Sequence, residues 1–167
     1  MNNNILNIIR FVLLIFLQVI LFNNIHMFGF ANPYPYILYI LLFPVNGNKN
    51  ILLISSFFLG LIIDMFCNSG GIHAMACTTL AFVRPNLFRF SFGISYEYQT
   101  VKIADKITSE RISYILLAIF IHHFILFLFE YFRFTLFFEI IYSTLVSTIL
   151  SFIICLLIIY LIKPNKR

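Results

Sequence analysis

Six apolar stretches follow one another along the sequence and limit the chain to one class of fold. They cover approximately residues 11–28, 34–45, 51–66, 72–83, 112–132 and 136–162. Because 62% of the residues are hydrophobic and only 10% are charged, a soluble domain of 167 residues could not bury them all. About 20 apolar helical residues cross the hydrocarbon core of a bilayer. We therefore expect an all-α integral membrane protein, a single domain over residues 1–167 with about six transmembrane helices in one bundle.

The second and fourth stretches are shorter than a full span. Each must borrow flanking residues, thin the bilayer locally or remain partly re-entrant. Pro33, Pro35 and Pro44 bracket the second stretch without interrupting it, so residues 36–43 can be helical. On this ground we favour six crossings over five. The first stretch is followed by no cleavage site and is interpreted as a retained anchor.

The basic residues predict how the chain is oriented. Cytoplasmic loops of membrane proteins are enriched in Lys and Arg. Six crossings with a cytoplasmic N-terminus place ten of the eleven Lys and Arg residues inside and only Arg133 outside. Five crossings with the N-terminus outside place nine of the basic residues inside and two outside. The charge distribution therefore predicts the side of the C-terminal tail more firmly than the side of the N-terminus. We predict that both termini are cytoplasmic.

The longest connection, residues 84–111, is predicted to be a cytoplasmic loop. Its basic residues alternate with aromatic ones, a pattern that also occurs in nucleic-acid-binding segments. Beside two membrane spans, the pattern favours contact with lipid headgroups or with a partner protein. We therefore expect membrane lipids, and no nucleic acid, among the contacts of this chain.

Small residues line one face of two of the predicted helices. In the last stretch Ser143, Ser147 and Ser151 recur every four residues, which places them on one helical face. In the third stretch Ser56 and Gly60 repeat the pattern. Such faces let helix backbones approach closely in a membrane. We interpret them as packing faces, within the chain or, as the alternative, against a partner.

Asp64 continues the small-residue face of the third stretch and is its one acidic residue. A carboxylate in a span is costly unless it reaches the interface, finds a partner or takes up a proton. Three roles are compatible with Asp64: a relay for protons or ions, a ligand for a substrate, and a polar anchor for neighbouring helices. We favour a structural organiser or a cap for the next helix, at Gly70–Gly71.

Patterns typical of enzymes and metal sites do not occur in the sequence. The adjacent His122 and His123 point about 100° apart on a helix, so both cannot face one haem iron. The three cysteines have no metal-ligand spacing. Motifs for hydrolases, P-loops and zinc peptidases are missing. We expect no cofactor, no metal and no catalytic residue, and we disfavour a lipid-modifying enzyme.

The segment from Gly60 to Ala74, together with Arg84-Pro85, resembles the core of the MreD family of rod shape-determining membrane proteins. That family has a glycine, an aspartate four residues later, a glycine-bearing turn, and a small-residue helix ending in a basic residue. The positions that match are Gly60, Asp64, Gly71 and Arg84. Chain length, a short second span and a long last helix with a basic tail also match.

The resemblance implies a non-enzymatic scaffold subunit of the bacterial elongasome in the inner membrane, which maintains rod shape and organises peptidoglycan synthesis. It implies an MreC-like partner, with MreB-like, RodA-like and class B penicillin-binding proteins in the same assembly. It also implies a fold similar to the S components of energy-coupling-factor transporters. The alternative is therefore a substrate-binding component of a vitamin-type transporter, for which Asp64, Asn68, His73 and Gln18 are the candidate ligands.

Overall fold

A computed structural model describes residues 3–25, 32–93, 108–132 and 134–162. All regular structure in these ranges is helical. The α-helices are α1 (Asn3–Ile20), α2 (Leu38–Leu42), α3 (Lys49–Cys67), α4 (Ile72–Phe92), α5 (Ser109–Tyr131) and α6 (Phe137–Ile162). Three short 3-10 helices are η1 (Phe22–Asn24), η2 (Pro35–Ile37) and η4 (Phe134–Leu136). The six α-helices match the number of apolar stretches in the sequence.

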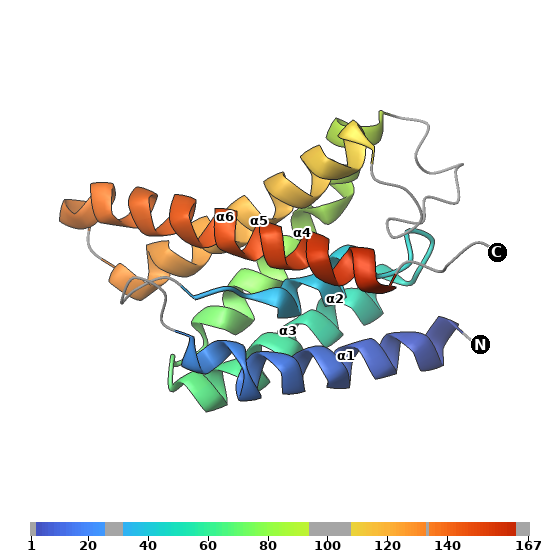
Figure 1. Cartoon of the computed structure of the whole chain (residues 1–167), viewed down its shortest axis with the longest axis horizontal. Helices are drawn as coiled ribbons and strands as arrows, with labels where there is room; N and C mark the ends of the chain where they lie inside the picture. The colour runs from blue at the N-terminus through green and yellow to red at the C-terminus, as the bar shows by residue number, and fades with distance from the viewer. Residues whose placement is uncertain (1–2, 26–31, 94–107, 133, 163–167) are drawn as a thin grey trace.

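The five long helices form a wall around the segment of residues 32–45, which we call the central segment. Neighbours along the chain pack together, with α3 on α4, α4 on α5 and α5 on α6, and α1 packs on α3. Helices α1 and α6 both contact η2, so they lie on either side of the central segment (Figure 1). The first turn of α1 and the last turn of α6 lie at the same end of the bundle (Figure 1).

The central segment is covered by protein on all sides. Every residue from 33 to 43 is buried, and Tyr36, Ile37 and Leu41 have no exposed surface. Its sequence is apolar on every face, so it can be surrounded completely, and Pro35 occupies the first position of η2, where its missing N–H is not needed. The helical expectation for residues 36–43 is confirmed for the part up to Leu42.

The second stretch is nevertheless not a lipid-facing transmembrane helix. Its regular part consists of three 3-10 residues and five α-helical residues, far short of the roughly 20 needed for a crossing. Hydrophobicity alone cannot distinguish a segment that is buried in protein from a helix that faces lipid, because both consist of apolar residues.

The boundary predicted for the fourth stretch is also wrong. Helix α4 continues past residue 83 to Phe92, and Arg84 and Pro85 lie inside it. The predicted loop of residues 84–111 is therefore shorter, because α4 takes its first nine residues and α5 begins at Ser109. The aromatic and basic residues expected to contact lipid or a partner between 94 and 107 lie outside the described residues.

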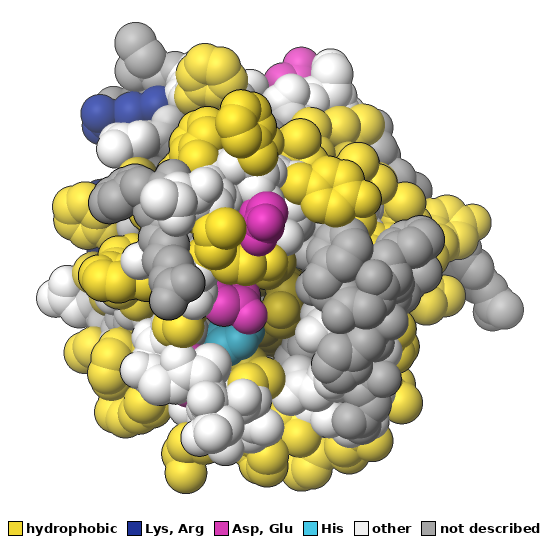
Figure 2. Space-filling view, turned by 90° about the vertical axis from the view of Figure 1, so that its left-hand side faces the viewer, with side chains coloured by type: hydrophobic (Ala, Val, Ile, Leu, Met, Phe, Trp, Pro, Cys, Tyr) yellow, Lys and Arg dark blue, Asp and Glu magenta, His cyan; other side chains and the backbone are white. Residues whose placement is uncertain are grey.

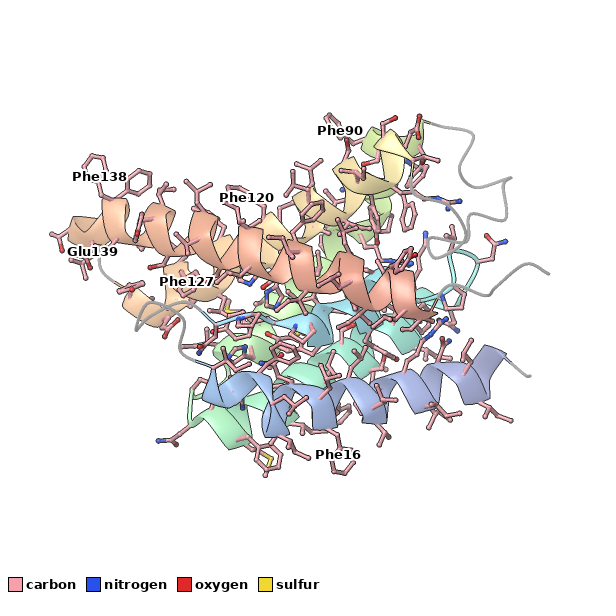
Figure 3. All side chains as sticks on the ribbon, in the orientation of Figure 1. Phe16, Phe90, Phe120, Phe127, Phe138 and Glu139 are labelled. Carbon is pink, nitrogen blue, oxygen red and sulfur yellow. The ribbon has the colours of Figure 1, made fainter. Side chains whose placement is uncertain are left out.

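Three of the described helices are long and apolar enough to cross a membrane, namely α3, α5 and α6. The apolar part of α1, Ile5–Ile20, is shorter. Large hydrophobic side chains cover the outside of the bundle. Phe16 of α1 and Phe138 of α6 point away from it (Figure 3), with 60% and 87% of their surface exposed. These features indicate a chain embedded in a membrane.

Candidate functional site

The Asp64 carboxylate lies at the end of α3 and contacts the start of α4. Its Oδ1 accepts hydrogen bonds from the His73 backbone N–H at 2.9 Å and from the Ser69 hydroxyl at 2.5 Å. Its Oδ2 accepts from the Ala74 backbone N–H at 2.8 Å. The first N–H groups of a helix have no partner within the helix, and the helix dipole favours a negative charge there. Asp64 therefore caps α4 from the preceding helix.

The turn between α3 and α4 makes this cap possible. Asn68 ends α3 in the left-handed conformation (φ 54°), and Gly71 precedes α4 with φ 102°. Few side chains tolerate these backbone angles, and glycine is the default residue for them. The chain thus reverses within four residues and presents the N-terminus of α4 to Asp64. This is the capping arrangement weighed in the sequence analysis, and it uses three acceptor contacts of the carboxylate.

Gly60 lies one turn before Asp64, where the backbone of α3 lies close to the start of α4. A Cβ atom placed on Gly60 would lie 2.4 Å from the Ala74 Cα and 2.5 Å from the His73 carbonyl carbon. Real Cβ atoms do not approach backbone this closely, so only glycine fits without displacing α4. Ser56, one turn earlier, is also fully buried. The Ser56–Gly60–Asp64 face is therefore a packing face within the chain.

Arg84 is buried inside the bundle and binds the end of α2. Its Nη2 donates a hydrogen bond to the backbone carbonyl of Phe43, and its Nε donates to the Tyr114 hydroxyl at 3.1 Å. Its guanidinium carbon lies 4.8 Å from the centre of the Phe88 ring. Arg10 of α1 donates to the preceding carbonyl, that of Leu42, at 3.3 Å. Two cations thus bind the negative end of the short helix, where the last carbonyls have no helical partner.

The serine face of α6 packs inside the bundle. Ser143, Ser147 and Ser151 are all buried. The Ser151 hydroxyl accepts a hydrogen bond from the Tyr34 backbone N–H at 2.9 Å and lies 3.2 Å from the His123 Nε2. This face is covered by the chain itself, so it is not the surface offered to a partner.

Buried tyrosine and histidine side chains form a polar chain through the middle of the bundle. The Tyr36 hydroxyl lies 2.7 Å from the Nδ1 of His73 and 3.1 Å from the Nε2 of His122. All three side chains are at most 4% exposed. No local sequence pattern indicates this chain of side chains, because it joins residues 37 and 86 positions apart. The sequence feature that could have indicated it is the presence of three polar aromatic side chains, each in a different apolar stretch.

A polar pocket opens at the end of the bundle that carries Asp64, Glu130 and Glu139, which we call the acidic end. Its volume is about 340 Å³. The residues that line it are Asn23, Asn32, Tyr34, Phe66, Cys67, Ser69, Ile72, His73, Leu126 and Glu130. Figure 2 shows this end, where histidine and acidic surface meet in a hollow between hydrophobic side chains. Of the four candidate ligands, only His73 lines the pocket. Asp64 and Gln18 bond to protein groups beside it.

No group of three His, Cys, Asp or Glu side chains among the described residues is arranged to hold a metal ion. The paired His122 and His123 bond in different directions. His122 lies against Tyr36, whereas the Nδ1 of His123 donates to the Ile119 carbonyl at 2.8 Å.

Comparison of the chain with family models, with curated proteins and with solved structures gives no match.

Proposed function

We propose that this chain is a non-enzymatic membrane scaffold subunit of the MreD type, which holds partners of the bacterial elongasome together in the inner membrane. The observation that carries the proposal is how the motif residues are used. Gly60, Asp64 and Arg84 each act on the backbone of a neighbouring element. These contacts hold neighbouring elements of the bundle in fixed positions. A scaffold needs such a fixed shape in order to hold its partners together.

The outward faces of the bundle are suited to partners that are themselves membrane helices. Along α1, side chains such as Leu13 and Phe16 are more than half exposed, and along α6 Ile149 and Leu157 are too. Apolar helix faces in a membrane contact either lipid or another helix. An MreC-like protein is the partner that the resemblance implies, with the MreB-like, RodA-like and class B penicillin-binding proteins in the same assembly.

The arrangement of the termini supports the proposed orientation. The start of α1 and the end of α6 lie at one end of the bundle, as an even number of passes along it requires, and the central segment makes one pass in addition to those of the five long helices (Figure 1). Arg10, Lys49 and Arg111 lie near that end, in the first half of α1 and the first turns of α3 and α5. Positive residues favour the cytoplasmic side. We therefore place both termini in the cytoplasm and the acidic end outside.

Crosslinking in living cells tests the scaffold directly. A photoreactive amino acid is introduced at Phe16, at Phe138 or, as the buried control, at Leu14 (4% exposed). We expect crosslinks to an MreC-like protein from at least one exposed position and none from Leu14. Recovery of no elongasome protein from either position, nor by gentle co-purification, would contradict the proposal.

One observation favours a second candidate, a substrate-binding component of a small-molecule transporter. The pocket at the acidic end has the size of a small-molecule site and several converging polar groups. Mass spectrometry of the gently purified protein distinguishes the candidates. A stoichiometric small molecule without elongasome partners supports the receptor, and the reverse result supports the scaffold.

A further inference from the structure

We propose that the pocket at the acidic end binds a small polar molecule that carries a positively charged amine. This inference goes beyond the scaffold, which needs no ligand, and it deepens the second candidate by naming its substrate class. The argument rests on the charge of the lining, on the donors and acceptors around it and on the way its floor is held.

The charge of the lining selects a cation. Glu130 is the one side chain with a full formal charge among the ten described residues that line the pocket, and no Lys or Arg is among them. Asp64 lies beside the pocket, but its carboxylate already accepts three hydrogen bonds from the turn and from α4. An amine close to Glu130 gains a charge-assisted hydrogen bond, whereas an anion would be repelled by both carboxylates.

The rest of the lining offers hydrogen bonds to a polar body. His73 is 4% exposed, and His122 and His123 are fully buried, so His73 provides the described histidine surface seen in the hollow (Figure 2). Its Nδ1 is already paired with Tyr36, which leaves the Nε2 for a ligand. The Asn32 side chain also lines the pocket and adds an amide group to its polar lining.

The floor of the pocket is held rigidly. The His73 backbone is fixed by Asp64 and the ring is fixed by Tyr36, which belongs to the central segment. A ligand therefore meets groups that are already oriented, which lowers the entropic cost of binding. The volume of about 340 Å³ lies at the small end of the usual range for ligand sites, so a compact molecule fits best.

Three probes of equal length separate charge from shape. These are 5-amino-1-pentanol (a cation), 1,5-pentanediol (neutral) and 5-hydroxypentanoate (an anion). Binding is measured by calorimetry on the full chain in phosphatidylcholine nanodiscs, whose lipid has no net charge to attract the amine. We expect the amine to bind at least about tenfold more tightly than the diol, since a hydrogen bond to a charged group is worth about that factor. The anion should bind most weakly.

Three variants locate the effect. Glu130→Gln should remove the preference for the amine, whereas Glu139→Gln, an exposed carboxylate at the same end but outside the pocket, should preserve it. Glu130→Lys should reverse the order and favour 5-hydroxypentanoate, a result that an unfolded protein could not give. Equal binding of amine and diol, no binding of any probe, or an unchanged preference in Glu130→Gln would each overturn the inference. None of these results affects the crosslinking test of the scaffold.

Discussion

Arg84 donates a hydrogen bond from its guanidinium to the backbone carbonyl of Phe43, the residue that directly follows the short helix α2. This contact joins α4 to the central segment. It explains how a charged side chain, 5% exposed, can lie inside an apolar bundle. The charge is balanced by carbonyl groups at the negative end of a helix, by the Tyr114 hydroxyl and by the Phe88 ring.

Arg84→Met should therefore destabilise the protein strongly. The substitution keeps an unbranched apolar stem but removes the guanidinium, which leaves the Phe43 carbonyl and the Tyr114 hydroxyl buried without this donor. Each lost partner costs about 1–3 kcal/mol, so we expect about 3 kcal/mol or more in the free energy of unfolding. Unfolding in mixed micelles of increasing denaturing detergent, followed by circular dichroism, measures it. Lys49→Met is the control, since Lys49 is exposed, and should change stability by less than about 0.5 kcal/mol.

Gly60→Ala should weaken the contact between α3 and α4. The new Cβ would overlap the backbone of His73 and Ala74, which cannot rotate away as a side chain would. Overpacking of this kind costs about 1–3 kcal/mol. The same unfolding assay checks it, with Met65→Ala as the control in the same helix, because Met65 is 77% exposed. A Gly60→Ala protein as stable as the parent would mean that the two helices do not cross this closely.

Much of this framework could be predicted from the sequence, and the parts that could not are instructive. The small-residue face at Gly60 and the turn after Asp64 are local patterns, and the helices formed where apolar stretches indicated them. The sequence predicts a span for the central segment, because a segment buried in protein is as apolar as one buried in lipid. The sequence predicts Arg84 in a cytoplasmic loop, because Lys and Arg at the ends of apolar stretches favour the cytoplasmic side. Its true partner, Phe43, lies 41 residues away.

Asp64→Asn distinguishes a cap from a proton relay. The amide keeps one acceptor oxygen, but its NH₂ group would face a backbone N–H, and the charge at the start of α4 is lost. We expect a loss of about 1–3 kcal/mol in stability, and a larger loss for Asp64→Ala. Glu139→Gln, an exposed carboxylate in the first turn of α6, serves as the control. If Asp64→Asn abolished the proposed function in cell shape while abundance and stability stayed normal, the cap would not be the main role of Asp64.

Ser151 and Ser147 provide the most closely matched comparison, because they lie one turn apart on the same buried face of α6. The Ser151 hydroxyl accepts from the Tyr34 backbone N–H, whereas the Ser147 hydroxyl has no hydrogen-bond partner among the described residues. Ser151→Ala leaves a buried N–H group unpaired and should cost about 1–3 kcal/mol. Ser147→Ala removes a hydroxyl that makes no bond and should be neutral within about 0.5 kcal/mol or slightly stabilising. Both variants remove one oxygen atom from the same face, so the difference in their unfolding free energies measures the hydrogen bonds of the Ser151 hydroxyl, to Tyr34 of the central segment and to His123 of α5. Equal losses in the two variants would show that α6 holds the segment by packing alone.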